Sequence, residues 1–517
     1  MEIFNLPGCI ENRTNASNRV FVMQDISARE FNEYCASLEK CGFITKEDRS
    51  VCSHRFMAYA KDDTGVFLNY FEPLGEFTVA VEENCKYFNF ADTPRNCSAS
   101  AQITQIALED FGMSYAIRLP DGRFIVIDGG RHFEPDRDRL YNCLIESSGG
   151  EKPVIAAWIL THPHSDHYIG FIVFMEQYGD RVTVERYILN FPDHDDFVHY
   201  PKLEKKDRRF EDVSAFTNIP KMWAQIEKSG GVAYTAHTGM RFNIGGANLE
   251  ILASMDDTIH RSSNINASSL VIRMELAGQV ILWATDASFS DARLPEKFGE
   301  YLKADILQVP HHGIQCGTAE AAMRGYDLIR PSVCLLPISE YNAYTAFSAH
   351  KESTKYLMTK VDSVEEIIVG TPQRTITIPY TAKKNARAEH DRLYRRGQER
   401  SGANTWVFTE LDTARESDFV FTLVNMTHQA ADLTIELFFE DSWQMVRSIK
   451  ATAAPLVIKK LNIVGDEVDG DYEYFDWLSL KKRGVPENAP FAVRFISDVP
   501  IVISHPDHTA AYTASDR

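Results

Sequence analysis

The chain has 517 residues, of which 44% are hydrophobic and 25% charged, a composition that excludes disordered and collagen-like proteins. Its 54 Lys and Arg residues stand against 73 Asp and Glu residues, giving a net charge of −19. This charge disfavours a standing nucleic-acid partner and docking on anionic membranes. At about 150 residues per domain, the length predicts three or four domains.

The N-terminus shows no targeting signal, because it lacks the basic and apolar regions of a signal peptide. The most apolar short stretch, Val154–Leu160, is far shorter than a membrane-spanning helix. The nine cysteines include no CxxC pair. We therefore expect a cytoplasmic protein with reduced thiols and no membrane partner.

Residues 1–100 predict a small α+β domain. Ser27 and Glu30 have capping-box spacing, and the helical pattern that follows ends at Gly42. No residue of this segment indicates chemistry. Strand patterns follow at His54–Ala60, Gly65–Phe71 and Glu76–Val81.

Residues 101–380 predict an α/β domain, because short apolar strands alternate with longer helical patterns. Polar motifs repeatedly follow the strands, where a sheet presents loops for chemistry. These motifs are Asp128-Gly129-Gly130 after Arg123–Ile127, Thr161 to His164 after Val154–Leu160, Asp286 after Val280–Ala284, and His311-His312-Gly313 after Ile306–Val309.

The rest of the chain predicts a linker and an all-β domain. Residues 381–400 hold seven Lys and Arg against three acidic residues, which favours a basic helical linker, with a local anion-binding patch as the alternative. Residues 401–517 predict a β-sandwich, whose strand candidates include Phe419–Asn425, Asp432–Phe439, Val457–Leu461, Phe491–Phe495 and Ile501–His505.

The strongest chemical signal is the spacing His162-x-His164-x-Asp166-His167. Imidazoles and a carboxylate are the ligands that a zinc-class ion prefers. His162 and His164 can point one way from a turn, while Asp166 and His167 reach a second point. This geometry suits two adjacent metal ions that share one hydroxide. A polar turn without metal is the alternative.

This motif resembles that of the metallo-β-lactamase-fold hydrolases, and the order of the other motifs agrees across 101–380. The resemblance implies an αββα sandwich flanked by the small N-terminal α+β unit and the C-terminal all-β sandwich. It also implies that Asp128 supports the metal loop and that Asp286 bridges two divalent metal ions, taken as zinc with manganese or iron as alternatives.

A finer resemblance is to the branch that contains the hydrolase domain of bacterial DNA-uptake channels and the phosphorylcholine esterases. It rests on Asn266 to Val271, on Asp286, on Val309 to Gly313 and on Asn342-Ala343-Tyr344. It implies that His350 is a metal ligand, although a leaving-group acid or a surface histidine is the alternative.

Many members have a separate histidine between the His-rich motif and the bridging aspartate. The candidates here have no persuasive setting: His194, His199, His237 and His260. In this branch the adjacent pair His311 and His312 fills that role instead. Adjacent side chains diverge, so we expect His312 to be a metal ligand and His311 to face the substrate.

The implied mechanism is hydrolysis by a metal-bridging hydroxide, since two divalent ions lower the pKa of water from about 15.7 towards 7. Asp166 would orient the hydroxide, and His311 would donate a proton to the substrate or leaving group. A long, charged segment, Asp193–Asp207, is a candidate lid.

The C-terminal segment has a second resemblance, to the sensory-rhodopsin transducer family. It rests on Asn425 to Asp441 and on Ser497 to His505, and it implies a recognition or assembly module that makes the chain a homo-oligomer.

Three functions follow as hypotheses. The first is a binuclear metal-dependent hydrolase of a small, anionic, phosphodiester-type substrate. The second is a metal-dependent hydrolase of an ester, lactone, thioester or amide, because this fold hosts all of these reactions. The third is a non-catalytic ligand-binding or assembly protein. The complete set of ligands, from His162 to His167 together with Asp286, argues against the third.

Overall fold

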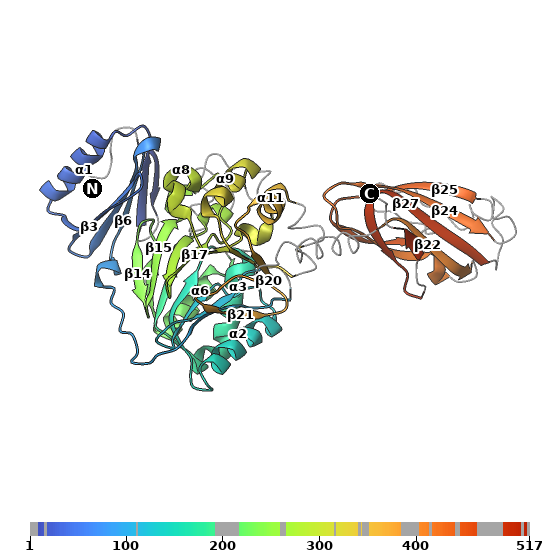
Figure 1. The fold of residues 1–517 in the computed structure, drawn as a ribbon, viewed down its shortest axis with the longest axis horizontal. Helices are drawn as coiled ribbons and strands as arrows, with labels where there is room; N and C mark the ends of the chain where they lie inside the picture. Colours follow the sequence, from blue (N-terminus) through green and yellow to red (C-terminus); the bar gives the residue numbers. More distant parts are fainter. Residues whose placement is uncertain are drawn as a thin grey trace. The chain divides into compact units, whose positions relative to one another are not determined.

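The computed structural model describes residues 9–14, 18–109, 112–191, 217–258, 265–314, 317–339, 343, 351–383, 403–412, 416–439, 445–462, 490–507 and 511–513. The chain separates into two compact units, Met1–Glu340 with Lys351–His390 and Tyr341–His350 with Asp391–Arg517. Each unit has its own sheets (Figure 1).

A six-stranded antiparallel sheet forms the start of the first unit, in the order β1-β2-β6-β5-β4-β3. Helix α1 (Ala28–Lys40) begins at the predicted capping box of Ser27 and Glu30. Its buried face packs against the sheet through Phe31 and Leu38. The strands are β1 (Cys9–Thr14), β2 (Asn18–Met23), β3 (Ile44–Val51), β4 (His54–Lys61), β5 (Thr64–Phe71) and β6 (Glu76–Glu82).

The second sheet has the order β13-β12-β10-β9-β8-β7-β21, with β11 (Thr183–Val184) beside β10. Strands β9, β10, β12 and β13 are parallel, whereas β9, β8, β7 and β21 pair antiparallel. The strands are β7 (Ala101–Gln105), β8 (Tyr115–Arg118), β9 (Phe124–Ile127), β10 (Val154–Leu160), β12 (Arg186–Leu189), β13 (Val232–Thr235) and β21 (Arg374–Ile378).

The third sheet has the order β14-β15-β16-β17-β18-β19-β20. Its first four strands pair antiparallel and its last four are parallel. The strands are β14 (Arg241–Ile244), β15 (Ala247–Ala253), β16 (Val271–Leu276), β17 (Gln279–Trp283), β18 (Ile306–Gln308), β19 (Val333–Leu336) and β20 (Glu366–Val369).

The second and third sheets share one hydrophobic core, which contains Ile159 of β10 and Ile272 of β16. The neighbouring β10 residue Trp158 faces the opposite way, into a cluster with Phe171 and Met222 of the helices. Strand β10 is therefore covered on both faces, which explains its uninterrupted apolar sequence. The helices of this cluster are α2 (Glu134–Ser147), α3 (Ser165–Tyr178) and α6 (Ile219–Ser229).

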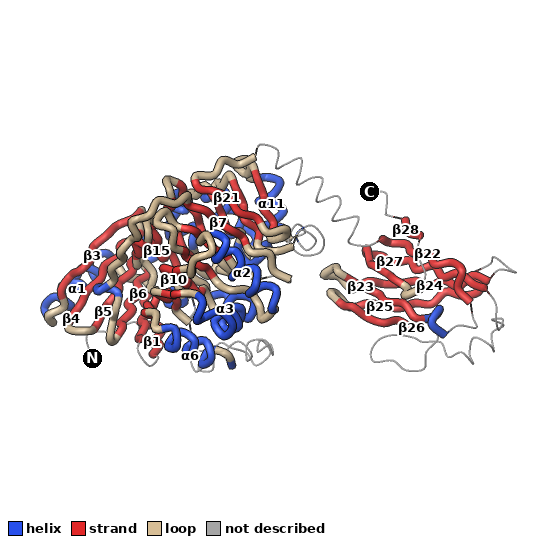
Figure 2. Tube along the Cα trace, turned by 90° about the horizontal axis from the view of Figure 1, so that it is seen from below, coloured by secondary structure: helices blue, strands red, loops and turns tan. Residues whose placement is uncertain are grey.

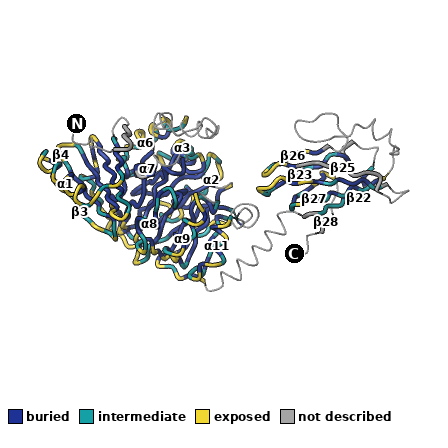
Figure 3. The backbone as a smooth tube through the Cα atoms, turned by 90° about the horizontal axis from the view of Figure 1, so that it is seen from above, coloured by how far each residue is buried: buried dark blue, intermediate teal, exposed yellow. Residues whose placement is uncertain are grey.

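A separate group of helices lies on the other side of these layers, away from α2 and α3 (Figure 1). Figure 2 shows α2, α3 and α6 beside the strands of the first unit, and Figure 3 shows that the buried backbone is concentrated in the interior of this unit. The predicted α/β class is confirmed at this level. The helices are α8 (Leu294–Phe298), α9 (Ala319–Ile329) and α11 (Glu352–Lys360).

From Ala403 onward, the described residues of the C-terminal unit form antiparallel strands, their connecting turns and one short 3-10 helix. One correction applies, because Phe491–Phe495 and Ile501–His505 belong to a single strand, β27 (Pro490–Ser504). Its first half pairs with β24 and its end with β23, and the apolar alternation breaks where the partner changes. The other strands are β22 (Ala403–Asp412), β23 (Val420–Asn425), β24 (Ala431–Phe439), β25 (Met445–Ala453), β26 (Val457–Asn462) and β28 (Ala511–Thr513).

The sandwich arrangement of the C-terminal unit and its role in assembly stay predictions. No helix in the described ranges combines the length and the apolar character that crossing a membrane requires.

The N-terminal sheet packs closely on the third sheet of the same unit. A Cβ atom at Gly239 would lie 2.1 Å from the ring of Phe56, so the backbone there approaches the aromatic ring directly. Arg49 on β3 forms an ion pair with Glu250 on β15, with 3.3 Å between Nη1 and Oε1. These contacts join the N-terminal sheet to the middle of the first unit.

A buried histidine also joins these parts. His237, just after β13, lies with Nδ1 2.5 Å from Oδ2 of Asp256 and with Nε2 3.7 Å from Oε2 of Glu82 on β6. Burial alone would lower the pKa of His237, but Asp256 and Glu82 outweigh it and raise the pKa to about 9. The imidazole is thus held in its charged form between two carboxylates.

This arrangement makes stability depend on pH. The folded-state pKa of His237 lies above the ordinary 6.5, so its contribution is complete below pH 6.5 and is lost as the pH rises through 9. We expect the stability difference between the native chain and His237→Gln to shrink by about 3 kcal/mol between pH 6 and pH 10. Urea denaturation, with hydrogen exchange following the β6 amides, measures it. A pH-independent difference would contradict this account.

Candidate metal centre

The His-rich motif lies where a fully buried strand meets a helix. Strand β10 ends at Leu160, and α3 begins at Ser165 with His164 as its N-cap residue. His162 and His164 therefore lie in the extended connection, whereas Asp166 and His167 lie in the first turn of α3. A carboxylate at a helix N-terminus is favoured by the helix dipole.

Asp128 fixes this loop from the end of the neighbouring strand β9. Its carboxylate accepts hydrogen bonds from the Thr161 backbone amide (2.8 Å) and hydroxyl (2.7 Å). It also lies 2.7 Å from Nδ1 of His167. A histidine whose Nδ1 is bound by a carboxylate presents Nε2 as its free nitrogen, which is the usual arrangement behind a metal ligand.

Two glycines allow Asp128 to come this close. A Cβ atom at Gly170 of α3 would lie 1.9 Å from the carbonyl oxygen of Gly129, and one at Gly129 would lie 2.4 Å from the amide nitrogen of Phe171. The amide of Gly129 donates to the carbonyl of His167 at 2.7 Å, and that of Gly170 donates to the carbonyl of Gly130 at 2.8 Å. No larger residue fits between the Asp128 turn and α3.

Asp286 and His312 come from the third sheet. Asp286 follows β17, and the preceding Thr285 donates its backbone amide to Oε1 of Gln308 on β18 at 2.5 Å. His312 lies in the turn Pro310–Gly313 after β18, and its Nδ1 lies 3.1 Å from the carbonyl oxygen of Pro337. His312 therefore also presents Nε2 to the cluster.

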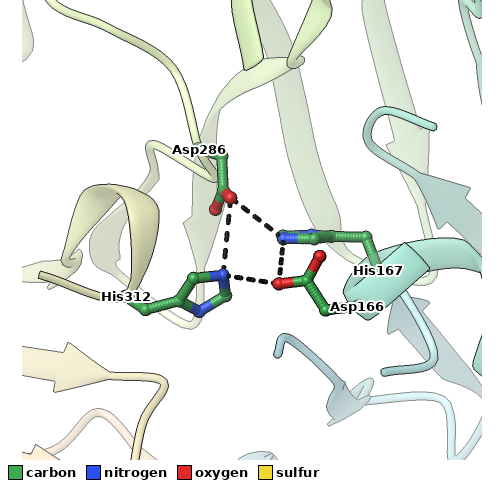
Figure 4. A group of neighbouring side chains, drawn as sticks. All are labelled: Asp166, His167, Asp286 and His312. Carbon is green, nitrogen blue, oxygen red and sulfur yellow. Dashed lines mark ion pairs between the residues drawn. The ribbon is translucent and has the colours of Figure 1, made fainter. Parts of the chain in front are cut away.

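Four buried side chains form one group of possible metal ligands, Asp166, His167, Asp286 and His312 (Figure 4). Nε2 of His312 lies 3.1 Å from Oδ2 of Asp166 and 3.4 Å from Oδ2 of Asp286. Nε2 of His167 lies 3.1 Å from the same Asp286 oxygen and 3.8 Å from Asp166 Oδ2. The donor atoms of two helical and two loop residues thus face one point.

A second group consists of His162, His164 and again Asp286. Nε2 of His162 lies 3.1 Å from Nδ1 of His164 and 3.8 Å from Oδ2 of Asp286. Thr161 Oγ1, which donates to Asp128, lies 3.1 Å from Nδ1 of His162. Asp128 therefore supports both groups, and Asp286 belongs to both.

His311 lies beside the cluster but in neither group. Its Nε2 is 4.0 Å from Asp286 Oδ2 and 3.2 Å from the side-chain nitrogen of Asn266. His311 and His312 have φ values of 49° and 54°, so the chain turns sharply between them and their side chains diverge. The backbone amide of His311 donates to the carbonyl of Thr285 at 2.8 Å.

The histidines fall into two sets, one with lowered and one with raised pKa values. Burial lowers the pKa of His162, His164 and His311, which keeps these rings neutral and suited to act as ligands or donors. Burial would also lower the pKa of His167 and His312, but the negative charges of Asp286 and Asp166 outweigh this effect and raise the pKa of both rings. The pKa of His312 rises to about 9, and that of His167 rises well above its ordinary value.

The residues present fit a divalent cation. Burial opposes ionisation of Asp166 and Asp286, yet His167 and His312 hold the pKa of both carboxyls well below the ordinary value. In the described ranges, these carboxylates and Asp128 form ion pairs with histidines only, not with Lys or Arg. Oδ1 of Asp286 is buried and has no hydrogen-bond partner among the described residues. Buried negative charge among imidazole nitrogens is the donor set of zinc-class ions.

The structure thus brings together six of the seven ligands that the sequence predicts: His162, His164, Asp166, His167, Asp286 and His312. His350 lies outside the described residues, as do His194, His199, His260 and the lid candidate Asp193–Asp207. His237 is described and lies in the bridge with Asp256 instead. Sequence reasoning missed the contact of Gly170 with Gly129, for which a glycine in the middle of a helical pattern is the available signal.

Comparison with known proteins agrees with part of this description. Residues 108–240 match the model of the Metallo-beta-lactamase superfamily, and this stretch includes Asp128 and the motif from His162 to His167. No curated protein matches the chain.

Two solved structures show weak similarity. A flavo di-iron protein mutant from Thermotoga maritima is 10% identical over 66% of this chain and 61% of its own, with a TM-score of 0.22. The Anabaena sensory rhodopsin transducer is 20% identical over 20% of this chain and 82% of its own, with a TM-score of 0.16. At these values neither similarity says what this chain does.

The glycine contact makes a testable prediction. We expect Gly170→Ala to push α3 away from the Asp128 turn, to misplace His167 and to weaken zinc affinity by about 10- to 100-fold. Gly179→Ala at the end of the same helix is the matched control, because its Cβ would be 3.4 Å from the nearest atom, the Cε of Met175. Titration with a zinc chelator measures both variants, and equal affinity would show that the contact does not position the ligands.

Proposed function

We propose that residues 101–380 form an αββα domain of the metallo-β-lactamase type that is a binuclear metal-dependent hydrolase. The observation that carries this proposal is that Asp286 belongs to both ligand groups. One carboxylate shared by two sets of imidazoles is the arrangement that two-metal hydrolytic sites use. Zinc is the proposed metal, with manganese or iron as alternatives.

The two groups differ in a way that suits catalysis. The group of Asp166, His167, Asp286 and His312 offers four ligand atoms, whereas that of His162, His164 and Asp286 offers three. Four protein ligands are typical of a closed site, and three are typical of a catalytic site that keeps one position for water or substrate. The second group is thus the more open one, and His311 lies 4.0 Å from the Asp286 oxygen that both groups share.

The proposed substrate is a small anion of the phosphodiester type, with an ester, lactone, thioester or amide as the alternative class. When bound, two divalent ions would lower the pKa of water and stabilise negative charge on substrate oxygens. Asp166, in the first turn of α3, faces the cluster and is suited to orient the attacking water. His311 is suited to donate a hydrogen bond to a substrate oxygen or to the leaving group, since its neutral ring lies at the edge of the cluster.

Metal content tests the shared carboxylate. We expect about two zinc ions per native chain. His164→Ala should retain about one ion, because the four-ligand group is intact, whereas Asp286→Ala should lose affinity at both groups, because each group loses a ligand. Elemental analysis of chelator-free protein measures this. Asp305→Ala is the control, because Asp305 binds the backbone amide of Val280 at the opposite end of β17. No metal in the native chain, or two ions in Asp286→Ala, would contradict the proposal.

Substrate class needs a separate measurement. We expect the native chain to hydrolyse bis-p-nitrophenyl phosphate faster than a lactone or a thioester, and Asp286→Ala to lose the activity by about 100-fold or more. Faster turnover of the lactone or thioester would favour the alternative class. Turnover of none of them by protein that holds metal would favour the non-catalytic hypothesis.

A further inference from the structure

Asn266 is the one polar side chain in the described ranges for which a hydrogen bond to the ring of His311 is found. It lies in the short 3-10 turn η5 (Ile265–Ser268) and is 3% exposed. The turn is tied to the metal loop, because the amide of Leu270 donates to the carbonyl of Thr161 at 3.1 Å. The backbone carbonyl of Asn266 accepts from the amide of Ser269 at 3.1 Å. Asn266 is therefore held in place relative to His162 and His164.

The contact engages one ring nitrogen in particular. The side-chain nitrogen of Asn266 lies 3.2 Å from Nε2 of His311, so in this orientation the amide donates and Nε2 accepts. A neutral imidazole that accepts at Nε2 carries its proton on Nδ1. Nε2 is also the nitrogen nearer to Asp286, at 4.0 Å. The amide thus binds the lone pair that would otherwise be available to a metal ion in the three-ligand group.

The second ring nitrogen of His311, Nδ1, carries the proton of the neutral ring. Nδ1 of His311 is buried and has no hydrogen-bond partner in the described part of the chain. A buried N–H without a partner costs free energy in the free protein, and such groups in native proteins usually serve a purpose. Beside a hydrolytic centre, a bound substrate atom is the partner that fits.

We propose that Asn266 is a positioning residue that keeps His311 out of the metal coordination and fixes its Nδ1–H as the hydrogen-bond donor to the leaving oxygen. This inference rests on the proposed function. As the attacking water bonds to phosphorus and the bond to the leaving oxygen breaks, the electron pair stays on that oxygen, where the hydrogen bond from Nδ1–H stabilises it. The leaving oxygen then takes the proton that the attacking water loses.

A hydrogen-bond donor to the leaving oxygen matters most when the leaving group is poor, because a poor leaving group carries more negative charge as the bond breaks. This dependence provides the test. Two aryl phosphodiesters are compared, one with p-nitrophenolate and one with phenolate as the leaving group. We expect Asn266→Ala and His311→Gln to lower kcat about 100-fold for phenolate and less than about 3-fold for p-nitrophenolate, with KM unchanged. Both variants should retain the native zinc content.

The chain offers a matched control. His54 and Asn69 form another buried pair, with 2.9 Å between Nε2 and Oδ1, in the N-terminal sheet. Asn69→Ala removes a buried amide from a histidine without touching the cluster, so we expect it to keep the native rate on both esters. Equal losses on both esters in Asn266→Ala, or a loss of zinc, would show a structural role and overturn the inference.

A second variant and a second readout do not depend on turnover. Asn266→Asp has nearly the same shape, but its carboxylate accepts from Nε2–H and so reverses the tautomer of His311. Long-range nitrogen–proton correlation spectra, with His311→Gln to identify the signal, should show Nδ1–H in the native chain and Nε2–H in Asn266→Asp. Nε2–H in the native chain would overturn the inference. Absence of turnover by the native chain on both esters would instead contradict the proposed function.

Discussion

Three carboxylates, those of Asp128, Asp166 and Asp286, are buried in one small region, and in the described ranges only histidines pair with them. A buried carboxylate loses hydration worth several kcal/mol unless positive charge and hydrogen bonds replace it. Here the pKa values of His167 and His312 are raised so that these rings supply the positive charge. A divalent cation would replace that charge and release the protons from His167 and His312. The burial of the carboxylates, which is costly without a cation, therefore favours metal binding.

The backbone around these carboxylates is strained, and hydrogen bonds hold it. Asp128, Thr285, His311 and His312 have φ values between 49° and 54°, a region that costs a non-glycine residue about 1 to 3 kcal/mol. The amide of Asp128 donates to the carbonyl of Ile159 at 2.9 Å, and that of His311 donates to the carbonyl of Thr285 at 2.8 Å. The strain therefore lies at four residues in three turns beside the cluster, and buried strands such as β10 supply the stability that supports it.

The residues of the cluster could be predicted from sequence because a metal site, if one exists, limits residue type and spacing within a short segment. Four of them lie between His162 and His167, and Asp286 and His312 each follow an apolar strand. The roles of the two nitrogens on each ring could not be predicted, because the partners are distant in sequence. Asn266 and His311 are 45 residues apart, and Asp128 and His167 are 39 apart. Which side chain faces which nitrogen depends on tertiary packing that no local pattern contains.

The same limit applies to the fold. The helix at Ser27 and the strand Val154–Leu160 follow from local signals, the capping box and an apolar run. Strand β3 gives no such signal, since its central residues are polar and exposed or partly exposed, and its pairing with β4 specifies it. The sequence of β27 predicts two strands because the apolar pattern is interrupted where its pairing changes from β24 to β23. Pairing between distant segments decides these elements, because the preference of a residue for a strand depends strongly on its cross-strand neighbours.

The N-terminal sheet contains no ligand, yet it is connected to the turn that carries Asn266. Glu82 and Asp256 bind opposite nitrogens of His237, and Asp256 lies in α7 (Met255–Thr258). At the end of α7, the hydroxyl of Thr258 donates to the carbonyl of Ala267, the residue after Asn266. Because these contacts are buried, displacement of β6 would leave charged groups unpaired next to that turn. The geometry of the turn that carries Asn266 therefore depends on the contact of Glu82 with His237, and Glu82 lies in a strand whose own sequence indicates no chemistry.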